Sequence, residues 1–335
     1  MDSKPDTAAR AIVSRGPLSE GQWAIEPVTL KPLKENELKI QVLSVGVCHT
    51  DLTVGNTPRE YGAYPGVLGH EGCGIVLDVG PKVKVAKVGD RVLLSFRFCK
   101  DCFFCKNGHP SYCSMFTPLN MGFGDYPREF ATGTDGASVK GFFFGQSSFS
   151  EVTIVSETSV INMSGYVDTD EELKLLAPLG CGMQTGAGAV MQLQSLDEDD
   201  SIAIFGLGAV GFSAVAAAKH RGVKTIIVID LVQSRLDLAK SFGATHALNP
   251  SLLKDKLTST VKGITGGLGT SVTIDATGNV NVIKQAINIT RNQGEICMLG
   301  VPPPGTILDI DITSFLGSGK KLFGSVEGGV VPSEV

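Results

Sequence analysis

The chain has 335 residues, enough for two domains of ordinary size, and its 42% hydrophobic and 19% charged residues are typical of a globular protein. The formal net charge is −5 and no basic stripe is present, which argues against nucleic acid as a partner. The N-terminus carries no apolar signal core, and no apolar run reaches the ~18 residues that cross a bilayer. We therefore expect a cytoplasmic protein without a membrane partner.

The first half of the chain is expected to be β-rich. Alternation of apolar and polar residues predicts strands at 37–47, 74–79 and 90–94, between turns of Gly, Pro and Asp. Residues 114–141 are glycine-rich and show no regular pattern. A loop of that length in a compact domain is usually a lid or a binding loop, which is the prediction for this stretch.

Four cysteines lie close together just before that stretch, at the spacing Cys-x2-Cys-x2-Cys-x7-Cys: Cys99, Cys102, Cys105 and Cys113. Four thiolates on short loops suit a tetrahedral zinc ion, and they close its coordination shell against water and substrate. Such a site supports structure and does no chemistry. The competing interpretation is a set of disulfides, which the absence of a secretory signal disfavours.

The second half changes its pattern near residue 183, where short apolar runs begin to alternate with helical periodicity. Strands are predicted at 201–205, 225–230, 246–248, 271–276, 295–299 and 321–326. Helices are predicted at 209–221, 234–242, 254–263 and 280–290. Strands that alternate with helices in this way predict a doubly wound parallel sheet, so the fold class is α/β.

A Gly-x-Gly-x-x-Gly turn follows the first strand of this sheet and opens the first helix, with the glycines at Gly206, Gly208 and Gly211. In that context the motif indicates a dinucleotide site, with the pyrophosphate at the helix N-terminus beside Ala209 and Val210. Its glycines permit a tight turn, close approach of the phosphates, and close packing of helix on strand.

An acid ends the next strand, at Asp230. A carboxylate there accepts hydrogen bonds from a ribose 2′-hydroxyl and repels a 2′-phosphate, which favours NAD over NADP. The competing interpretation is that Asp230 only caps a turn. Arg235, nearby, either softens that preference or contacts the ribose.

The motifs occur together in an order that resembles the zinc-containing alcohol dehydrogenases of the medium-chain dehydrogenase/reductase family. They are Gly46-Val-Cys48-His49-Thr50-Asp51, Gly69-His70-Glu71, the four cysteines, Cys181-Gly182 and the glycine turn. The resemblance runs from about residue 8 to the end of the chain. The segment Phe143-Phe-Gly-Gln-Ser-Ser-Phe149 is similar to the aryl-alcohol dehydrogenase branch.

The resemblance implies a domain organisation: a GroES-like catalytic domain at 1–182, with a structural zinc lobe at about 95–115, and a Rossmann NAD-binding domain at 183–327. Residues 328–335 would begin a return to the first domain. The family continues for several dozen residues beyond this point, so its C-terminal segment is expected to be missing here.

The resemblance also implies two zinc ions per chain, one of them catalytic and held by Cys48, His70 and Cys181 with an open fourth position. Glu71 and Asp51 would orient this site, and Thr50 would relay the alcohol proton. The position three residues later, often His in the family, is Thr53 here, which leaves the outer relay open. The remaining expected contacts are His49 and Thr185 with the cofactor, Leu299, Gly300 and Val301 along the nicotinamide, and Ser95, Phe143 and Phe144 around the substrate.

The function implied is transfer of a hydride between NAD and a primary, aromatic or medium-sized alcohol, giving the aldehyde or the reverse. One alternative is an S-(hydroxymethyl)glutathione (formaldehyde) dehydrogenase. Another is a truncated, catalytically silent protein that binds NAD and zinc. A homodimer is expected, paired through an edge strand at 294–299 or 321–326, and Cys73 and Cys297 are expected to fill core positions.

Overall fold

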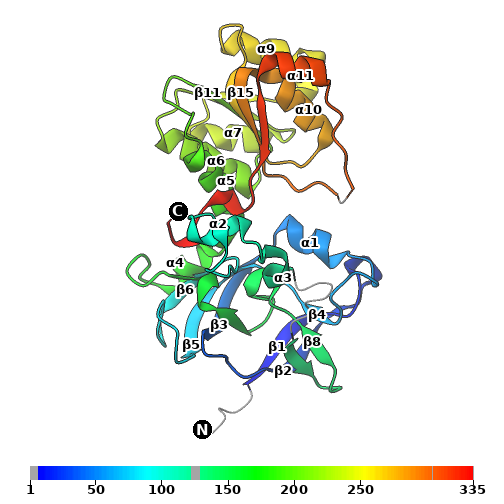
Figure 1. Ribbon diagram of the computed structural model, residues 1–335, viewed down its shortest axis with the longest axis vertical. Coiled ribbons are helices and arrows are strands. Elements are labelled where there is room, and N and C mark those ends of the chain that lie inside the picture. Colours follow the sequence, from blue (N-terminus) through cyan, green and yellow to red (C-terminus); the bar gives the residue numbers. More distant parts are fainter. Residues whose placement is uncertain (1–6, 122–128, 304, 335) are drawn as a thin grey trace. The chain divides into compact units, whose positions relative to one another are not determined.

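The computed structural model describes residues 7–121, 129–303 and 305–334. It separates into two compact units: unit one is Met1–Cys181 with Val331–Glu334, and unit two is Gly182–Val330. Figure 1 labels their elements along the chain. No helix in the described part of the chain is long and apolar enough to cross a membrane.

Unit one contains a closed, mainly antiparallel barrel in the strand order β1-β2-β7-β8-β4. A five-stranded antiparallel sheet follows the order β10-β6-β5-β3-β9. The barrel strands are β1 (Thr7–Ser14), β2 (Trp23–Leu30), β4 (Gly66–Val67), β7 (Glu129–Gly133) and β8 (Ser138–Lys140). The sheet strands are β3 (Glu37–Gly46), β5 (Glu71–Val79), β6 (Arg91–Leu94), β9 (Val152–Ser156) and β10 (Val160–Asn162).

Short helices connect the strands of unit one: α1 (His49–Gly55), α2 (Phe103–Lys106), α3 (Phe116–Asn120) and α4 (Asp170–Leu175). The prediction of an irregular loop over 114–141 was wrong, because α3, β7 and β8 lie within it. Residues 122–128 of that stretch lie outside the described residues. The glycines there mark turns between short elements, and the pattern of each element is too short to stand out in the sequence.

Unit two is a six-stranded parallel sheet in the order β13-β12-β11-β14-β15-β16. Counted within the unit this is 3-2-1-4-5-6, the order of dinucleotide-binding sheets. The strands are β11 (Ser201–Phe205), β12 (Thr225–Ile229), β13 (His246–Leu248), β14 (Thr270–Asp275), β15 (Thr290–Met298) and β16 (Lys321–Gly324). The predicted α/β fold class is confirmed.

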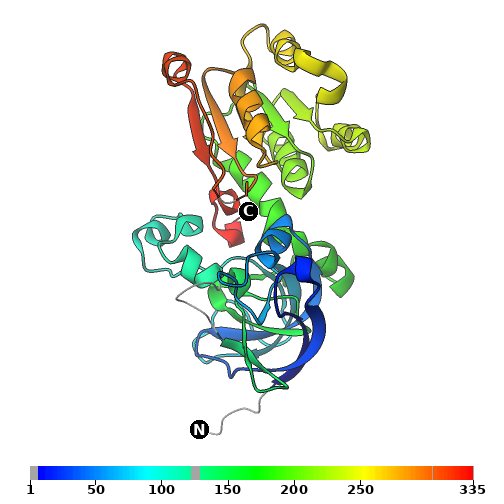
Figure 2. The ribbon, with the colours of Figure 1, turned by 90° about the vertical axis from the view of Figure 1, so that its right-hand side faces the viewer.

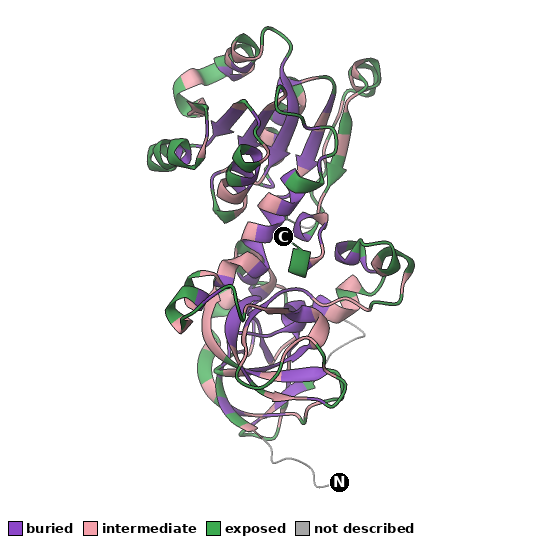
Figure 3. Cartoon of the chain, turned by 90° about the vertical axis from the view of Figure 1, so that its left-hand side faces the viewer, coloured by how far each residue is buried: buried purple, intermediate pink, exposed green. Residues whose placement is uncertain are grey.

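Helices cover both faces of the six-stranded sheet (Figures 1 and 2). They are α5 (Gly182–Gln192), α6 (Ala209–His220), α7 (Gln233–Phe242), α8 (Pro250–Leu253), α9 (Leu257–Ile264), α10 (Val280–Ile289) and α11 (Ile312–Ser318). Successive side chains of a strand point to opposite faces, so each strand feeds two cores. Ile202 and Ile204 pack with α6 and α7, whereas Ala203 and Phe205 pack with α9 and α10. Figure 3 shows the strands of this sheet mostly buried and the outer helix faces exposed.

Two predictions about unit two need correction. The helix predicted at 254–263 begins at Leu257, because Lys254 has a φ of 52° and separates α8 from α9. Residues 294–299 are not an edge strand, since β15 lies between β14 and β16. The edge strand next to β15 is β16, within 321–326, and β13 forms the opposite edge.

Candidate metal centres and nucleotide site

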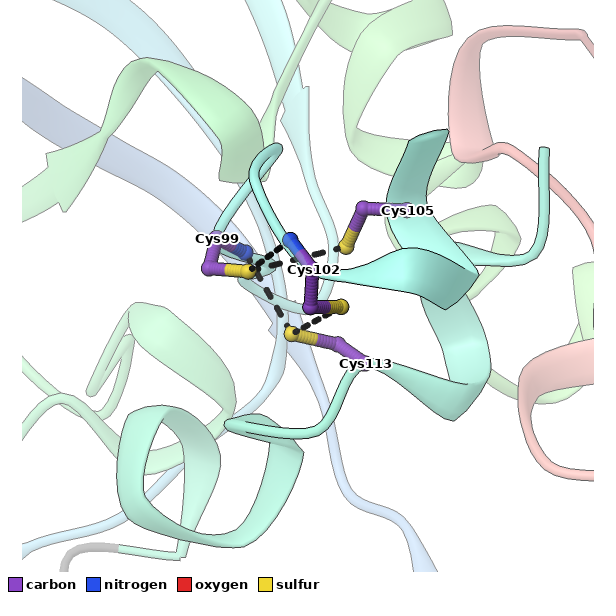
Figure 4. Close-up of side chains that lie close together, drawn as sticks. All are labelled: Cys99, Cys102, Cys105 and Cys113. Carbon is purple, nitrogen blue, oxygen red and sulfur yellow. Dashed lines mark hydrogen bonds between the residues drawn. The ribbon is translucent and has the colours of Figure 1, made fainter. Parts of the chain in front are cut away.

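The four clustered cysteines converge at one point in unit one (Figure 4). Their sulfur atoms all lie within 4.8 Å of one another, and all four are free thiols. The Cys99–Cys105 and Cys102–Cys113 sulfur pairs are 3.9 and 4.0 Å apart. A tetrahedron of zinc–sulfur bonds of ~2.3 Å has edges of about 3.8 Å, so the cluster fits zinc. The competing interpretation as disulfides is wrong for this structure.

Backbone N–H groups point at these sulfurs. The amides of Cys102 and Ser114 donate to Cys99 Sγ and Cys102 Sγ at 3.3 and 3.5 Å. Hydrogen bonds from the backbone amides of Cys105 and Ser114 lower the pKa of the Cys102 thiol to about 5. Cys102 therefore favours the thiolate, which is the form that binds a metal ion, whereas burial raises the pKa of the Cys105 and Cys113 thiols, from which a metal ion would have to displace the proton.

A second group of possible metal ligands also lies within unit one: Cys48, His70 and Cys181, whose ligand atoms lie within 4.8 Å of one another. Cys48 is the N-cap of α1, His70 immediately precedes β5, and Cys181 follows the 3₁₀ helix Ala177–Gly180. A Cβ on Gly180 would overlap the carbonyl oxygen of Leu94, so only glycine lets the chain pass β6 at this point.

His70 supplies the clearest sign of a ligand. Its ring is fully buried, and Nε2 has no hydrogen-bond partner. A buried polar atom left unpaired is costly and rare, so this nitrogen fits a metal ion that would take its lone pair. Burial alone would lower the pKa of His70, but the hydrogen bond to Asp51 and the neighbouring Cys48 outweigh it and raise the pKa to about 10.

Cys48 carries the negative charge that complements His70. Interaction with Cys181 lowers the pKa of the Cys48 thiol to about 3, with a further contribution from His70, and both outweigh the opposing effect of burial. Thr50 lies two residues further on, and its hydroxyl is 3.6 Å from Cys48 Sγ. Without a metal the chain thus pairs an anionic sulfur with a protonated imidazole, and a zinc ion, which thiolate and imidazole suit, would displace the proton from Nε2.

Asp51 connects two of the candidate ligands, Cys48 and His70, through hydrogen bonds to its carboxylate. Its Oδ2 accepts from the amide of Cys48 at 2.9 Å, and its Oδ1 accepts from the Gly69 amide at 3.1 Å and from His70 Nδ1 at 3.0 Å. The proton is thereby held on Nδ1, which leaves Nε2 for a metal. Glu71 is buried nearby, and a Cβ on Gly46 would overlap its carboxylate.

The residues expected around the substrate are deeply buried. Phe144 stacks on the His70 ring at a centroid distance of 4.5 Å, and Phe143 meets it edge-on at 5.2 Å. Only 1% of Phe143 and 6% of Phe144 is exposed. Ser95 is fully buried and donates to the carbonyl of Gly180 at 2.7 Å. Phe143 and Phe144 therefore contact the candidate ligand His70 itself, and Ser95 holds the residue before Cys181.

The glycine turn of unit two joins β11 to α6. Gly206 has a φ of +86°, a conformation that favours glycine, and a Cβ on Gly211 would overlap the carbonyl oxygen of Gly206. A Cβ on Gly208 would meet no atom within 4 Å. Ala209 and Val210 begin α6. The geometry fits the three roles that such glycines have at a phosphate-binding turn.

Asp230 lies just after β12, where only 9% of it is exposed. Its Oδ2 accepts from the amide of Leu207 at 2.6 Å and its Oδ1 from the amide of Val232 at 2.7 Å, with Arg235 3.9 Å away. The turn-capping role is thus present. Each carboxylate oxygen has a second lone pair, so this role does not prevent contact with a ribose.

Sequence reasoning missed Asp275, at the end of β14. Its backbone carbonyl accepts from the amides of Leu299 and Gly300 at 2.8 and 3.0 Å, and its carboxylate accepts from Thr277 and Gly278. Asp275 therefore holds the turn after β14 against the expected nicotinamide segment. An acid at the carboxyl end of a parallel strand was the available signal.

Two further residues expected at the nicotinamide differ in exposure: Val301 is 68% exposed, and Thr185 is buried in α5.

Cys73 and Cys297 are fully buried in apolar clusters, which confirms their expected core positions.

A first unit bearing two groups of zinc-type ligands, together with a dinucleotide-type sheet in the second, is the architecture of a zinc-dependent oxidoreductase. Residues 34–165 match the alcohol dehydrogenase GroES-like domain, and residues 209–335 match the zinc-binding dehydrogenase model. The chain is 39% identical over 336 residues to geraniol dehydrogenase of Castellaniella defragrans, a match that covers 99% of this chain and 86% of that protein. The chain belongs to the zinc-containing, medium-chain alcohol dehydrogenases.

Solved structures agree. A zinc-binding-domain alcohol dehydrogenase protein from Burkholderia ambifaria superposes with a TM-score of 0.89 and 38% identity, covering 98% of this chain and 87% of the other. Benzyl alcohol dehydrogenase from Acinetobacter calcoaceticus gives a TM-score of 0.86 and 35% identity, with coverages of 98% and 86%.

Proposed function

We propose that this protein is an NAD-dependent alcohol dehydrogenase that interconverts a primary, aromatic or medium-sized alcohol and its aldehyde. The observation that carries the proposal is the buried, unpaired Nε2 of His70 beside the sulfurs of Cys48 and Cys181. The similarity to geraniol and benzyl alcohol dehydrogenases supports the choice of alcohol.

The proposal gives the chain two zinc ions. Cys48, His70 and Cys181 would hold the catalytic ion and leave a fourth position open, while Cys99, Cys102, Cys105 and Cys113 would hold the structural ion. When bound, the catalytic ion would polarise the alcohol oxygen as a Lewis acid.

The chain's own groups then handle protons and orientation. Thr50, whose hydroxyl lies beside Cys48 Sγ, would accept the proton of the alcohol and pass it outward. Thr53 is exposed at the next turn of α1 and offers a hydroxyl where a histidine would continue the relay. Asp51 keeps the His70 proton on Nδ1, and Glu71 would tune the charge of the site.

The cofactor is assigned to unit two. The glycine turn would bind the pyrophosphate of the cofactor. The adenosine ribose would contact Asp230 and Arg235. The nicotinamide would contact residues 299–301 and Thr185. His49, exposed at the start of α1, keeps its proposed role at the cofactor phosphates. For the substrate, Phe143 and Phe144 remain proposed walls, although their burial against His70 leaves them little free surface.

A second candidate substrate is S-(hydroxymethyl)glutathione. The chain is 36% identical over 330 residues to the S-(hydroxymethyl)glutathione dehydrogenase of Aspergillus oryzae, covering 96% of this chain and 82% of that protein. A third reading is a catalytically silent protein that binds NAD and zinc.

NADH formation measured with benzyl alcohol, with geraniol, and with formaldehyde plus glutathione separates the three. We expect turnover with the first two. Turnover confined to formaldehyde with glutathione would favour the second candidate. No turnover with any alcohol, in protein that carries both zinc ions and binds NAD, would overturn the proposed function.

We also propose a homodimer and a reducing compartment such as the cytoplasm. The dimer would pair through β16, which is the strand at the edge of the six-stranded sheet next to β15. The eight free cysteines support a compartment where thiols stay reduced. Sedimentation velocity, with Phe323 at this edge changed to lysine (F323K), tests the dimer: a wild-type monomer would refute it.

A further inference from the structure

The side chain of Gln146 lies against one edge of β5, at the start of that strand. On one edge, β5 pairs with β3 as far as Gly46 opposite Glu71. On the other edge, pairing with β6 covers only Cys73 to Ile75. Among the described residues, no strand pairs with that second edge beside His70 and Gly72.

The side chain of Gln146 occupies this place. Its Nε2 donates to the carbonyl of His70 at 2.7 Å, and its Oε1 accepts from the amide of Gly72 at 3.1 Å. Residues i and i+2 of a strand present their N–H and C=O groups to the same edge, where a neighbouring strand would bond them. The glutamine amide therefore substitutes for a strand on either side of Glu71.

Gln146 is itself fixed. It is fully buried, its backbone N–H donates to the Phe143 carbonyl at 3.0 Å, and its backbone carbonyl accepts from the hydroxyl of Thr153. The turn around it holds Phe142, Phe144 and Ser147 at positive φ angles of 63°, 47° and 56°. Non-glycine residues keep such angles only when their surroundings enforce them.

The same turn places Phe143 and Phe144 on the imidazole of His70. The His70 ring is thus held by the two aromatic rings and by Asp51 at Nδ1, and its main chain is held by Gln146. A metal ion needs its ligand within a few tenths of an ångström of the ideal place, so the support behind the ligand determines how well the ion is held.

We propose that Gln146 is a positioning residue for the metal ligand His70: its side-chain amide completes the edge of β5 and fixes the backbone from which the imidazole projects. This inference rests on the proposed zinc site at Cys48, His70 and Cys181. Gln146 touches no reacting atom, so its effect is on retention of the metal and geometry of the site.

The test compares Q146M with the wild-type enzyme. Methionine is close in size to glutamine but cannot form either hydrogen bond. We expect a chelator to remove the ion at the three-ligand site about ten- to hundredfold faster, in line with the loss of other groups behind metal ligands. The visible spectrum of the cobalt-substituted three-ligand site should shift, while the four-cysteine site keeps its spectrum and its rate of metal release.

T153V is the matched control. It removes a buried hydrogen bond from the same turn, but Thr153 bonds the Gln146 carbonyl and not the His70 strand. We expect lower thermal stability with unchanged metal release and cobalt spectrum. If Q146M does not fold, Q146N decides by the same two readouts, because it keeps an amide but is one methylene too short to reach both groups.

The outcomes separate the two proposals. A wild-type chain with two metal ions, and a Q146M variant that releases them at wild-type rates with an unshifted cobalt spectrum, would overturn the positioning role and leave the proposed function standing. A wild-type chain that binds metal only at the four cysteines would refute the proposed function itself. Equal metal loss in Q146M and T153V would also reject the specific role of Gln146, because it would reduce the effect to general destabilisation of the turn.

Discussion

Asp51 Oδ1 lies 3.0 Å from Nδ1 of His70, and both side chains are buried from solvent. The same carboxylate also accepts from the amides of Cys48 and Gly69. One acid therefore orients the imidazole and fixes the backbone at two of the three candidate ligands. This link joins α1 to the start of β5 and makes the ligand geometry a property of the fold.

The first prediction concerns D51N. Asparagine can accept only through its single carbonyl oxygen, so at least one of the three hydrogen bonds is lost and the charge that stabilises the His70 proton disappears. We expect zinc affinity at the three-ligand site to fall about ten- to hundredfold, with a matching loss of kcat. Competition with a chromophoric chelator measures the affinity. D237N, on the exposed surface of α7, serves as the control and should bind both zinc ions normally.

Burial on both faces explains why the sheet of unit two could be predicted from the sequence. Parallel strands covered by helices consist of continuous apolar runs, and the interior of β11 and β12 has this character. Their predicted ends lie within one residue of those in the structure. The antiparallel strands of unit one were harder. Within β2, Pro27 pairs with Arg10 of β1, and the pairing with β7 begins only at Val28. Proline is rare inside strands, so its presence in the sequence argues against a strand that the structure nevertheless forms.

The site followed the same division. Ligand residues could be assigned because the motifs resemble a family, but the groups behind the ligands could not. Gln146 bonds the backbone of His70, 76 residues earlier in the sequence, at a place where β5 has no neighbouring strand. No local sequence pattern encodes such a contact. Asp230 shows the opposite difficulty: the sequence indicated a ribose contact, and the structure adds backbone hydrogen bonds that the sequence left as an alternative.

The second prediction contrasts two glycines of the phosphate-binding turn. In G208A the new Cβ meets nothing within 4 Å, so the fold should persist while a pyrophosphate is kept off the backbone. In G211A the Cβ overlaps the Gly206 carbonyl, which should cost about 1–3 kcal/mol of stability. We expect G208A to melt like wild type yet bind NAD at least tenfold more weakly, as measured by calorimetry. G263A, an open helical position in α9, should bind NAD normally; an unchanged NAD affinity in G208A would contradict the assignment of the turn.

The third prediction is a shift in cofactor preference in D230N. The amide has no charge to repel a 2′-phosphate, and Arg235, 3.9 Å from the carboxylate, becomes free to attract one. The ratio of kcat/KM for NAD over NADP should fall at least tenfold. D237N, two residues beyond Arg235 on the exposed side of α7, should leave the ratio unchanged. If D230N lowers thermal stability but keeps the ratio, Asp230 acts only as the cap of its turn.

The fourth prediction uses the contrast between cysteine pKa values. Backbone hydrogen bonds lower the pKa of Cys102 to about 5, whereas burial raises the pKa of Cys73 to about 11 and that of Cys297 to about 12. At pH 7 Cys102 would therefore be mostly thiolate, whereas Cys73 and Cys297 would be almost wholly protonated. Only the thiolate reacts with an alkylating agent. After zinc is removed by a chelator, brief exposure to iodoacetamide should label Cys102 well before Cys73 or Cys297, as read by peptide mass spectrometry.

The zinc-loaded protein provides the comparison for that experiment. A metal ion on the four sulfurs competes with the alkylating agent for the same lone pairs, so labelling of Cys102 should be slow until the chelator is added. Lowering the pH to about 4 in the zinc-free protein should slow it again, because Cys102 becomes protonated below its pKa. Fast labelling of Cys102 that zinc does not suppress would mean that the four cysteines do not hold a metal, and that the lobe owes its shape to the chain alone.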